Sequence, residues 1–358
     1  MNELIKLLRC PETGSELEYH EIFKNEFSSG ILKSKDFGFL YPVIDEIPVI
    51  FPLSKRNVQQ EMVYFDLLLK KNTDNKIKNL IENFVFKLKA SNKNDSWEWE
   101  DVNFWDKIYH ENWEKLVNGD SSFYQKQLPE REFQRKKDFD FIINHNISDG
   151  LIFEIGAGSA IYTKEILKKL KNNIYVSCDM SINALRIRRK LLNRSDSYHI
   201  VCPINNLPFE NESAALILLL GILHHTEHKE HNLPYLTKIL QTKGLIYIDE
   251  VLYRPSFLSH KNIKRGVNIS AHEEHIFLDG LKYNLNVNGR IKYYKLFHTP
   301  FYNLIKNFFP SFVRRSYTSF KFVMLLDKFF MKIFSIISKR FNPGAVTIIW
   351  EKNESKKI

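Results

Sequence analysis

Residues 151–167 read LIFEIGAGSAIYTKEIL, and this stretch decides the fold. Apolar residues run into Glu154, a Gly-Ala-Gly turn occupies 156–158, and an amphipathic helical pattern follows. A strand that turns on glycines into the start of a helix presents backbone N–H groups to a ligand carrying phosphate, ribose or a charged tail. The alternatives at this point are a dinucleotide, a nucleotide, or a tight turn that holds no ligand.

From residue 151 onward, strand and helix patterns alternate. We expect strands at 151–155, 173–178, 198–202, 214–220 and 244–251, with helices such as 181–192 and 232–240 between them. Near-continuous apolar strands separated by amphipathic helices imply a parallel sheet covered on both faces, and therefore an α/β domain. After residue 253 the pattern loosens, and GAVTIIWEK at 344–352 predicts a final strand.

Three residues reduce the number of ligand classes that fit this turn. The third glycine of a dinucleotide fingerprint is replaced by Ile161, which argues against a dinucleotide. Glu154 stands at the end of the first strand, where a carboxylate suits a positively charged amino group better than a pyrophosphate. Asp179 follows the next strand, about 20 residues beyond the glycines, where an acid can accept hydrogen bonds from both ribose hydroxyls.

Four segments in register resemble the class I S-adenosylmethionine-dependent methyltransferases, especially the group related to the quinone-biosynthesis methyltransferases. These segments are EIGAGSA at 154–160, CDMS at 178–181, LPFENESAALILLLGILHH at 207–225 and ILQTKGLIYIDE at 239–250. The resemblance covers residues 151–251 and extends to the closing strand. It implies a Rossmann-like, doubly wound, mostly parallel seven-stranded sheet with an antiparallel last strand, and S-adenosylmethionine as the cofactor.

The resemblance also implies a set of cofactor-binding residues. The methionine end would be held by Glu154, Gly156, Ala157 and Gly158, and the ribose by Asp179. Met180 would lie against the adenine, with Ile204 and Asn205 at its edge, and Leu220 would lie near the sulfonium. Tyr124 would lie over the cofactor; an ordinary packing role is the alternative for this residue.

One position departs from the pattern of the family. Many relatives have an aspartate four residues before the leucine of the LPF turn, bonded to the adenine amino group. Here that position is Pro203. Adenine recognition must then rest on backbone groups or on Asn205, or binding is weak.

Histidines supply the candidate base. A hydroxyl acceptor needs a group that takes its proton, and histidine has a near-neutral pKa. His225 follows the fourth strand, at the sheet edge where ligands bind in such folds, and we expect it to face the acceptor; a purely structural histidine is the alternative. Glu274 and His275 are alternative bases in a lid or acceptor pocket, or parts of a capped loop. No metal is expected, although the His-rich runs at 224–231 and 272–275 have metal-like spacings.

We therefore expect methyl transfer to an oxygen of a small-molecule, glycan or lipid-linked acceptor. The chain lacks the Asn/Asp-Pro-Pro-aromatic motif that many amino-group methylators carry. The alternatives are an RNA methyltransferase and a non-catalytic binding module with the methyltransferase fold.

The N-terminal residues have a resemblance of their own. LLRCPETGSEL at 7–17 and GFLYPVIDEIPVIFP at 38–52 resemble the small zinc-ribbon-derived domain that activates several RNA- and protein-modifying methyltransferases. Only Cys10 remains of the ligands, and Thr13 stands where its partner thiolate would be, so no zinc is expected. We expect a small α+β accessory domain at 1–53, a helical linker or cap at 54–120 with a polar linker at 91–101, and the methyltransferase domain at 121–353, with its core at 150–251 and an aromatic helical insertion at 300–342.

The composition limits the cellular compartments and the binding partners that we expect for this chain. The 358-residue chain has three widely separated cysteines, which favours a reducing cytoplasm, and neither a secretory signal nor an apolar run of roughly 18–20 residues is recognisable. The net charge of +10 fits either a solvated basic surface or an anionic partner such as RNA, a phosphorylated glycan or acidic lipid. Nucleic acid is the less favoured of these, because no RNA-binding motif accompanies the charge.

Residues 316–341 predict an unusual helix. Lys321, Lys328, Lys332, Ser335 and Lys339 form one polar stripe on an otherwise apolar and aromatic segment. Such a helix would pack on the catalytic domain or on a dimer partner. Alternatively, it would rest on anionic lipid as a peripheral membrane contact.

Overall fold

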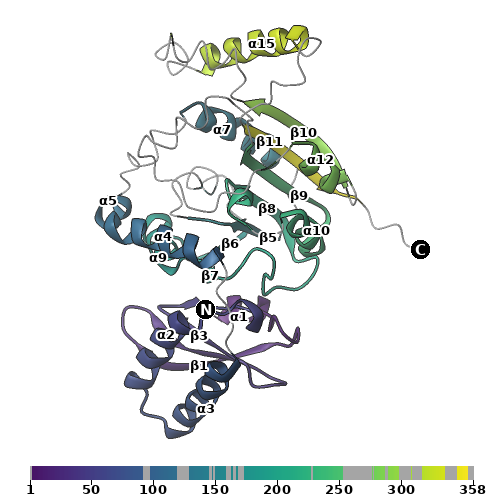
Figure 1. Cartoon of the computed structure of the whole chain (residues 1–358). Coiled ribbons are helices and arrows are strands. Elements are labelled where there is room, and N and C mark those ends of the chain that lie inside the picture. Colours follow the sequence, from purple (N-terminus) through teal and green to yellow (C-terminus); the bar gives the residue numbers. More distant parts are fainter. Residues whose placement is uncertain are drawn as a thin grey trace, which may run out of the picture.

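The computed structural model describes residues 2–91, 97–118, 129–144, 147, 150–158, 163, 167, 173–226, 229–252, 276, 278–286, 289–297, 308, 317–334 and 345–353. These residues form a seven-stranded mixed sheet with helices on both faces and a separate four-stranded antiparallel sheet near the N-terminus. In Figure 1 the small sheet lies at one end of the molecule and the large sheet in the middle. The predicted α/β class is confirmed.

The large sheet has the predicted doubly wound arrangement. Its strand order is β10-β11-β9-β8-β5-β6-β7, and β11 runs antiparallel to both of its neighbours while the other neighbouring pairs are parallel. The strands are β5 Leu151–Ile155, β6 Ile174–Asp179, β7 Ser197–Val201, β8 Ala214–Leu220, β9 Leu240–Val251, β10 Gly289–Phe297 and β11 Ala345–Lys352. The central strand β5 is buried along its whole length, which is why it reads as a continuous apolar run.

Two strands differ from the sequence expectation. β9 begins at Leu240 rather than at residue 244, because Leu240 already pairs with Ala214 of β8, and the register then shifts before Leu245 pairs with Leu216. β10, which reads GRIKYYKLF, was not located by its sequence. It is the outermost strand, and Arg290 and Tyr294 on it are exposed, so it lacks the apolar run that marked the central strands.

Helices cover both faces of the large sheet. α9 Ile182–Leu192 packs near β6 and β7, while α10 Lys229–Ile239 and α12 Leu278–Asn286 pack near β9 and β10. α9 begins at Ser181, whose hydroxyl accepts a hydrogen bond from the Ala184 N–H at 3.0 Å, and ends at Asn193 in the left-handed conformation. α7 Pro129–Asn144 packs on β9 through Phe139, whose ring lies 5.1 Å from that of Tyr247.

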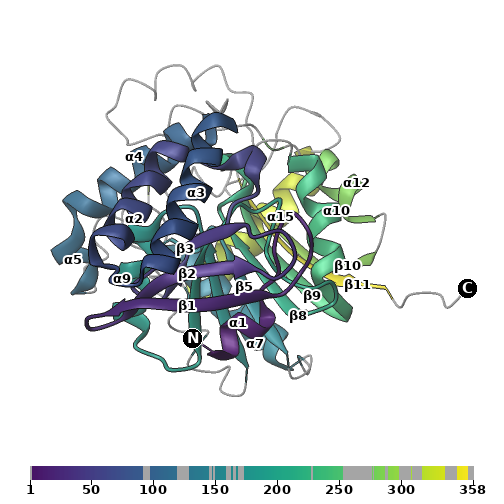
Figure 2. The same cartoon turned by 90° about the horizontal axis from the view of Figure 1, so that it is seen from below.

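The N-terminal unit is a four-stranded antiparallel sheet with helices on one face. After α1 Asn2–Leu7, the strands β1 Leu17–Lys24, β2 Ser28–Ser34, β3 Leu40–Ile44 and β4 Ile47–Pro48 pair in chain order, followed by the short η1 Leu53–Lys55. α2 Val58–Lys71 and α3 Asn75–Ser91 pack together along this sheet, as Figure 2 shows. Cys10 is a buried thiol 3.2 Å from the Tyr41 hydroxyl, and the Thr13 hydroxyl lies 2.9 Å from that of Ser15.

The N-terminal unit is joined to the large sheet at its β7 edge. Val49 forms a parallel bridge with Val201, and the Ile50 N–H donates to the Val201 carbonyl at 2.8 Å. The guanidinium of Arg186 on α9 donates to Asp45 at 2.7 Å. An edge strand exposes unpaired backbone groups unless something covers it, and here the N-terminal unit covers part of that edge.

The region expected to be a polar linker is partly helical. α4 Trp97–Glu111 begins inside it, and α5 Trp113–Val117 follows; both pack on α9. Trp99 is buried, with its ring 5.0 Å from that of Phe51, and its indole N–H donates to the Lys55 carbonyl at 3.2 Å. The stretch becomes helical despite its polar residues because Trp99 has a large apolar surface to bury. Within the described ranges, no helix combines the length and apolarity needed to cross a bilayer.

Candidate functional site

The glycine turn after β5 has the backbone geometry that only glycine adopts readily. Gly156 has φ +64° and Gly158 has φ +50°, both in the left-handed region. A Cβ on Gly156 would lie 2.2 Å from Cγ1 of Ile222, so the turn packs directly against the segment after β8. The Ala157 N–H donates to the Cys178 carbonyl at 3.1 Å. The turn is thereby fixed between the ends of β6 and β8.

Asp179 closes the other side of the turn. It stands at the end of β6, and its carboxylate accepts from the N–H groups of Gly158 and Ser181, each at 2.8 Å, one on each oxygen. Burial raises the pKa of Asp179, although these two amide donors oppose the rise. Each carboxylate oxygen has a second lone pair, so Asp179 can still accept from two hydroxyl groups.

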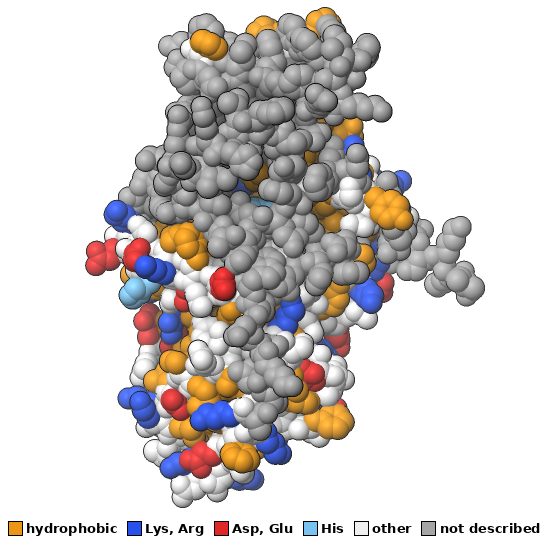
Figure 3. Space-filling view, viewed as in Figure 1, with side chains coloured by type: hydrophobic (Ala, Val, Ile, Leu, Met, Phe, Trp, Pro, Cys, Tyr) orange, Lys and Arg blue, Asp and Glu red, His pale blue; other side chains and the backbone are white. Residues whose placement is uncertain are grey.

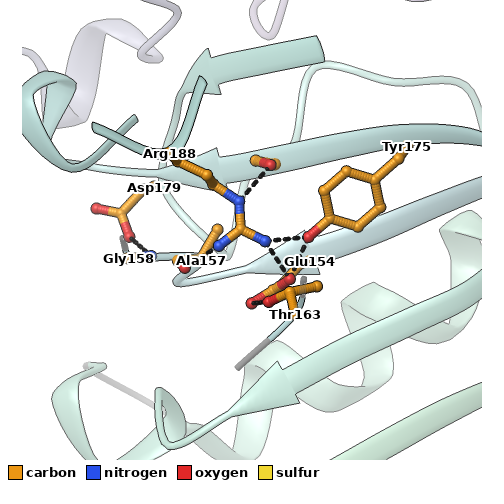
Figure 4. A network of polar contacts seen from close by, with 8 residues as sticks. Glu154, Ala157, Gly158, Thr163, Tyr175, Asp179 and Arg188 are labelled. Atoms are coloured by element: carbon orange, nitrogen blue, oxygen red, sulfur yellow. Dashed lines mark hydrogen bonds and ion pairs between the residues drawn. The ribbon is translucent and has the colours of Figure 1, made fainter. Parts of the chain in front are cut away.

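Glu154 lies beneath the turn in a buried ion pair (Figure 4). Its carboxylate accepts from the Thr163 hydroxyl at 2.8 Å, from the Tyr175 hydroxyl and from the Arg188 guanidinium, and the residue is 2% exposed. We expected this carboxylate to meet the amino group of a ligand. In the structure its partner is a cation of the protein itself.

Arg188 connects three parts of the site. From α9 it donates to Glu154, to the Ala157 carbonyl in the turn, and to the Ser177 hydroxyl at 2.8 Å. Sequence reasoning did not single it out. The available signal was an arginine within the apolar stripe of a helix, three residues after Leu185, where a charge is retained only if it is paired.

Residues after β6 and after β7 form a candidate adenine wall. Ile204 is buried, Met180 is half-buried against the cluster that includes Ile182, and Asn205 lies next to Ile204. The Asn205 Oδ1 atom is buried and accepts no hydrogen bond from the described part of the chain. An orphaned buried acceptor is costly unless a donor arrives, so this atom fits an exocyclic amino group of a ligand.

Two histidines follow β8 in the short η2 Leu223–His225. The His224 Nδ1 atom lies 2.5 Å from Oε1 of Glu250, a buried residue at the carboxyl end of β9. Burial raises the pKa of Glu250, but His224 and the N–H groups of Val251 and Leu223 outweigh it, and the pKa lies below its ordinary value. Sequence reasoning named His225 and missed Glu250, whose only signal was an acid at a strand end.

His225 is partly exposed and lies beside its neighbour. Its ring centroid is 4.0 Å from that of His224 and 5.9 Å from that of Trp105, which it meets edge-on. His225 thus lies after β8, at the carboxyl edge of the sheet. The neighbouring His224 contacts the Glu250 carboxylate.

Helix α4 lies beside the glycine turn. The Tyr109 hydroxyl would be 3.2 Å from a Cβ on Gly158. Asp106 accepts from the Ser181 hydroxyl and, at 2.9 Å, from the Asn183 amide at the start of α9, while burial raises its pKa. The region expected to be a linker or cap therefore contributes groups to the site. Its signal was the aromatic spacing of Trp105 and Tyr109 on one helical face.

The other expected positions divide into two groups. Leu220 is at the end of β8, partly buried against the core on one face of the sheet. Tyr124, Glu274 and His275 lie outside the described residues. Among the residues whose structure is described, no group of three or more His, Cys, Asp and Glu side chains could hold a metal ion.

Comparison with known proteins identifies the domain. Residues 153–248 match a family model described as a methyltransferase domain. No curated protein sequence matches the chain significantly.

Solved structures from several organisms match part of this chain. In a Haloferax volcanii complex between the Trm112 methyltransferase activator and a putative methyltransferase, the similarity covers 67% of this chain and 98% of that chain, with 14% identity and a TM-score of 0.44. The YcgJ protein of Bacillus subtilis is 12% identical, with a TM-score of 0.41, and the match covers 62% of this chain and 100% of that chain. Phosphoethanolamine N-methyltransferase 2 of Haemonchus contortus, in complex with S-adenosyl-L-methionine, is 13% identical, with a TM-score of 0.40, and the match covers 58% of this chain and 49% of that chain. With the family match, the sheet order and the glycine turn, residues 153–248 form a class I methyltransferase domain, and the protein is an enzyme that uses S-adenosylmethionine as its methyl donor.

Proposed function

We propose that this enzyme methylates an oxygen of a small-molecule, glycan or lipid-linked acceptor. The observation that carries the proposal is the pair formed by His224 and Glu250 at the carboxyl ends of β8 and β9. A hydroxyl group attacks a methyl carbon efficiently only if a base removes its proton, and a histidine oriented by a carboxylate is suited to that task. Ile222, which packs against Gly156, places this pair beside the glycine turn.

The residues of the site fit the methyl donor. S-adenosylmethionine, when bound, supplies a methyl group on a sulfonium that a nucleophile can displace. We propose that Asp179 binds the ribose through its two remaining lone pairs and that the Asn205 Oδ1 atom accepts from the adenine amino group. Asn205 would thereby replace the aspartate whose position Pro203 occupies. Met180, Ile204 and Leu220 would line the same site.

Glu154 would then act through the turn. Its ion pair with Arg188, which also bonds the Ala157 carbonyl, holds Gly156, Ala157 and Gly158 in the conformation that receives the methionine end. The glycine turn would thus bind the methionine end, and Glu154 would hold the turn in position.

The base would be His224, with His225 as its neighbour. His224 would accept the hydroxyl proton of the acceptor on its imidazole and would then pass that proton to solvent. Glu250, kept ionised by its low pKa, stabilises the positive charge that His224 carries in between. Trp105 packs edge-on against His225.

A transfer assay with radiolabelled methyl donor tests this proposal. Hydroxyl-bearing small molecules, glycans and lipid-linked intermediates are compared with tRNA, rRNA and protein. We expect label on oxygen, and we expect His224→Gln and Glu250→Gln to lower kcat by about 100-fold or more while S-adenosylhomocysteine binding is kept. His225→Gln is the matched control with the smaller loss. Label found solely on nitrogens of RNA or protein contradicts the proposal.

We further propose that the N-terminal unit is a zinc-ribbon-like activator built into the chain, within the organisation 1–53, 54–120 and 121–353. Its contacts with β7 through Val49 and with α9 through Asp45 support this, because they stabilise the strand that precedes Ile204 and Asn205 and the helix packed beside that strand. Cys10, Cys178 and Cys202 are free, buried thiols, which supports a cytoplasmic location.

A further inference from the structure

Helix α15, Tyr317–Phe334, turns an apolar face to solvent. Phe322 is 53% exposed, Leu325 57% and Phe329 61%, and these residues are spaced three and four positions apart. Val323 and Met324 on the other side of the helix are buried. The helix therefore packs on the body of the protein with one face and presents a second apolar face outward. A helix of a water-soluble domain ordinarily presents polar residues there.

This face lies at one extremity of the molecule. In Figure 1 α15 lies beyond α7 and β10, at the opposite end from the N-terminal unit. In Figure 3 hydrophobic side chains are visible over α15 at that same end. Phe308, just before the helix in the chain, is 72% exposed as well. A flat surface could thus reach these side chains without meeting the N-terminal unit.

The segment around the helix is strongly basic. Residues 301–342 contain eight lysines and arginines and a single acidic residue, Asp327, so this segment holds seven of the ten net positive charges of the chain. The same segment contains ten of its 28 phenylalanines. A charge imbalance spread evenly over a solvated surface would not gather in one aromatic segment.

Helical geometry places the charge beside the exposed apolar face. Lys321 is exposed and precedes Phe322. Lys328 and Lys332 follow Lys321 by seven and eleven positions, so the backbone positions of the three lysines lie on one side of the helix. This side is next to the one that carries Phe322, Leu325 and Phe329. Aromatic residues flanked by lysines are the composition of helices that lie in the headgroup region of a bilayer.

From this arrangement we infer that α15 docks the enzyme on an anionic lipid bilayer, with Phe322, Leu325 and Phe329 entering the headgroup region and the flanking lysines binding acidic headgroups. The charge of the segment selects this occupant, because a second copy of the same helix would bring a second basic segment against the first. No described helix crosses the bilayer, so the attachment is peripheral and reversible. The inference stands apart from the identity of the acceptor.

Vesicle co-sedimentation of the full chain tests the inference. Vesicles of phosphatidylcholine are compared with mixed vesicles of phosphatidylcholine and phosphatidylglycerol. We expect binding to the mixed vesicles that weakens as salt is raised, and we expect Phe322→Ser with Phe329→Ser to lower the partition coefficient about tenfold or more. Lys321→Glu should weaken binding and reduce its salt dependence.

A matched control is available on the N-terminal unit. Phe37 and Phe86 are 72% and 77% exposed, so Phe37→Ser with Phe86→Ser removes as much exposed aromatic surface far from α15 and should leave binding unchanged. Equal loss in both double variants, or equal binding to neutral and anionic vesicles, overturns the inference. The inference is also overturned if sedimentation velocity shows that the wild type is a dimer and that the α15 double variant is a monomer. Donor binding and transfer to a soluble acceptor, measured in the same variants, report on the proposed function separately.

Discussion

At the scale of single residues, the buried pair of Glu154 and Arg188 organises the glycine turn. Both side chains are almost completely buried, and Tyr175, Thr163 and Ser177 satisfy further polar atoms of the pair. Removal of one partner from a buried ion pair lowers the free energy of unfolding far more than removal of one partner from a surface ion pair. The turn therefore depends on an interaction that contains no ligand at all.

Breaking this pair should destabilise the fold. We expect Glu154→Gln to lower the free energy of unfolding by about 3 kcal/mol, because Arg188 is left buried beside a neutral amide. Chemical denaturation measures the change. Glu210→Gln is the matched control, since Glu210 pairs with Arg9 at the surface with 61% of its side chain exposed, and its loss should be well under 1 kcal/mol, as about 0–1 kcal/mol is typical for such pairs. Equal losses in the two variants would show that the buried pair has no special role.

Asn205 should contribute to cofactor affinity. If its Oδ1 atom accepts from the adenine amino group, Asn205→Ala removes one hydrogen bond in a buried site, and S-adenosylhomocysteine should bind about tenfold more weakly. Calorimetric titration measures this, and Asn206→Ala, the same change one residue along, should leave affinity unchanged. An unaltered affinity for Asn205→Ala would leave adenine recognition to the backbone.

At the scale of secondary-structure elements, the central strands were predictable and the peripheral elements were not. β5, β6, β8 and β11 follow the sequence expectation closely because burial on both faces imposes an apolar run. The edge strand β7 was also predicted, and its last three residues are buried. β10 is an edge strand and α4 begins inside a polar stretch, so their positions depend on tertiary contacts such as the packing of Trp99 on Phe51.

The candidate site shows the same division. Motifs next to the central strands predicted the glycine turn, Asp179 and a histidine after β8. Pairing between distant segments was beyond the sequence, because no local pattern indicates that Arg188 reaches Glu154 or that His224 meets Glu250.

Strand β7 carries a histidine that should make stability depend on pH. Burial, together with the charges of Arg188 and Arg189, lowers the pKa of His199 to about 3. Between pH 6.5 and about pH 3, His199 is protonated in the unfolded chain and neutral in the folded chain. The free energy of unfolding therefore falls by about 1.4 kcal/mol for each pH unit by which the pH is lowered.

Replacement of this histidine should remove that contribution. We expect the free energy of unfolding of His199→Gln to fall less steeply than that of the wild type between about pH 6 and pH 4. Denaturation across this range measures the slope, and His110→Gln, at an exposed position on α4, should keep the wild-type slope. Parallel slopes for His199→Gln and the wild type would place the acid sensitivity elsewhere.

At the scale of the whole molecule, the N-terminal unit and the methyltransferase domain share one core. Leu8, Tyr41 and Ile50 belong to the same cluster of buried residues as Phe153 and Ile217. Backbone pairing of Val49 with Val201 and the ion pair of Arg186 with Asp45 join the two parts further. Two units built on a common core are expected to unfold together.

Calorimetry should therefore show a single unfolding transition for the N-terminal unit and the large sheet. We expect Asp45→Ala to lower the midpoint of that transition without splitting it. Lys35→Ala, which removes an exposed ion pair with Glu16 within the N-terminal unit, should have little effect. Two separated transitions in the wild type would contradict a shared core.

The central claim is that the glycine turn and Asp179 form the adenosine site of a working methyltransferase. Isothermal titration of S-adenosylhomocysteine into the wild type, Asp179→Ala and the control Asp196→Ala tests it most directly, because Asp196 precedes β7 at the other end of the sheet and pairs with Arg194. The account predicts one site per chain in the wild type and in Asp196→Ala, and loss of binding in Asp179→Ala. Undiminished binding in Asp179→Ala, or no binding by the wild type, would contradict it.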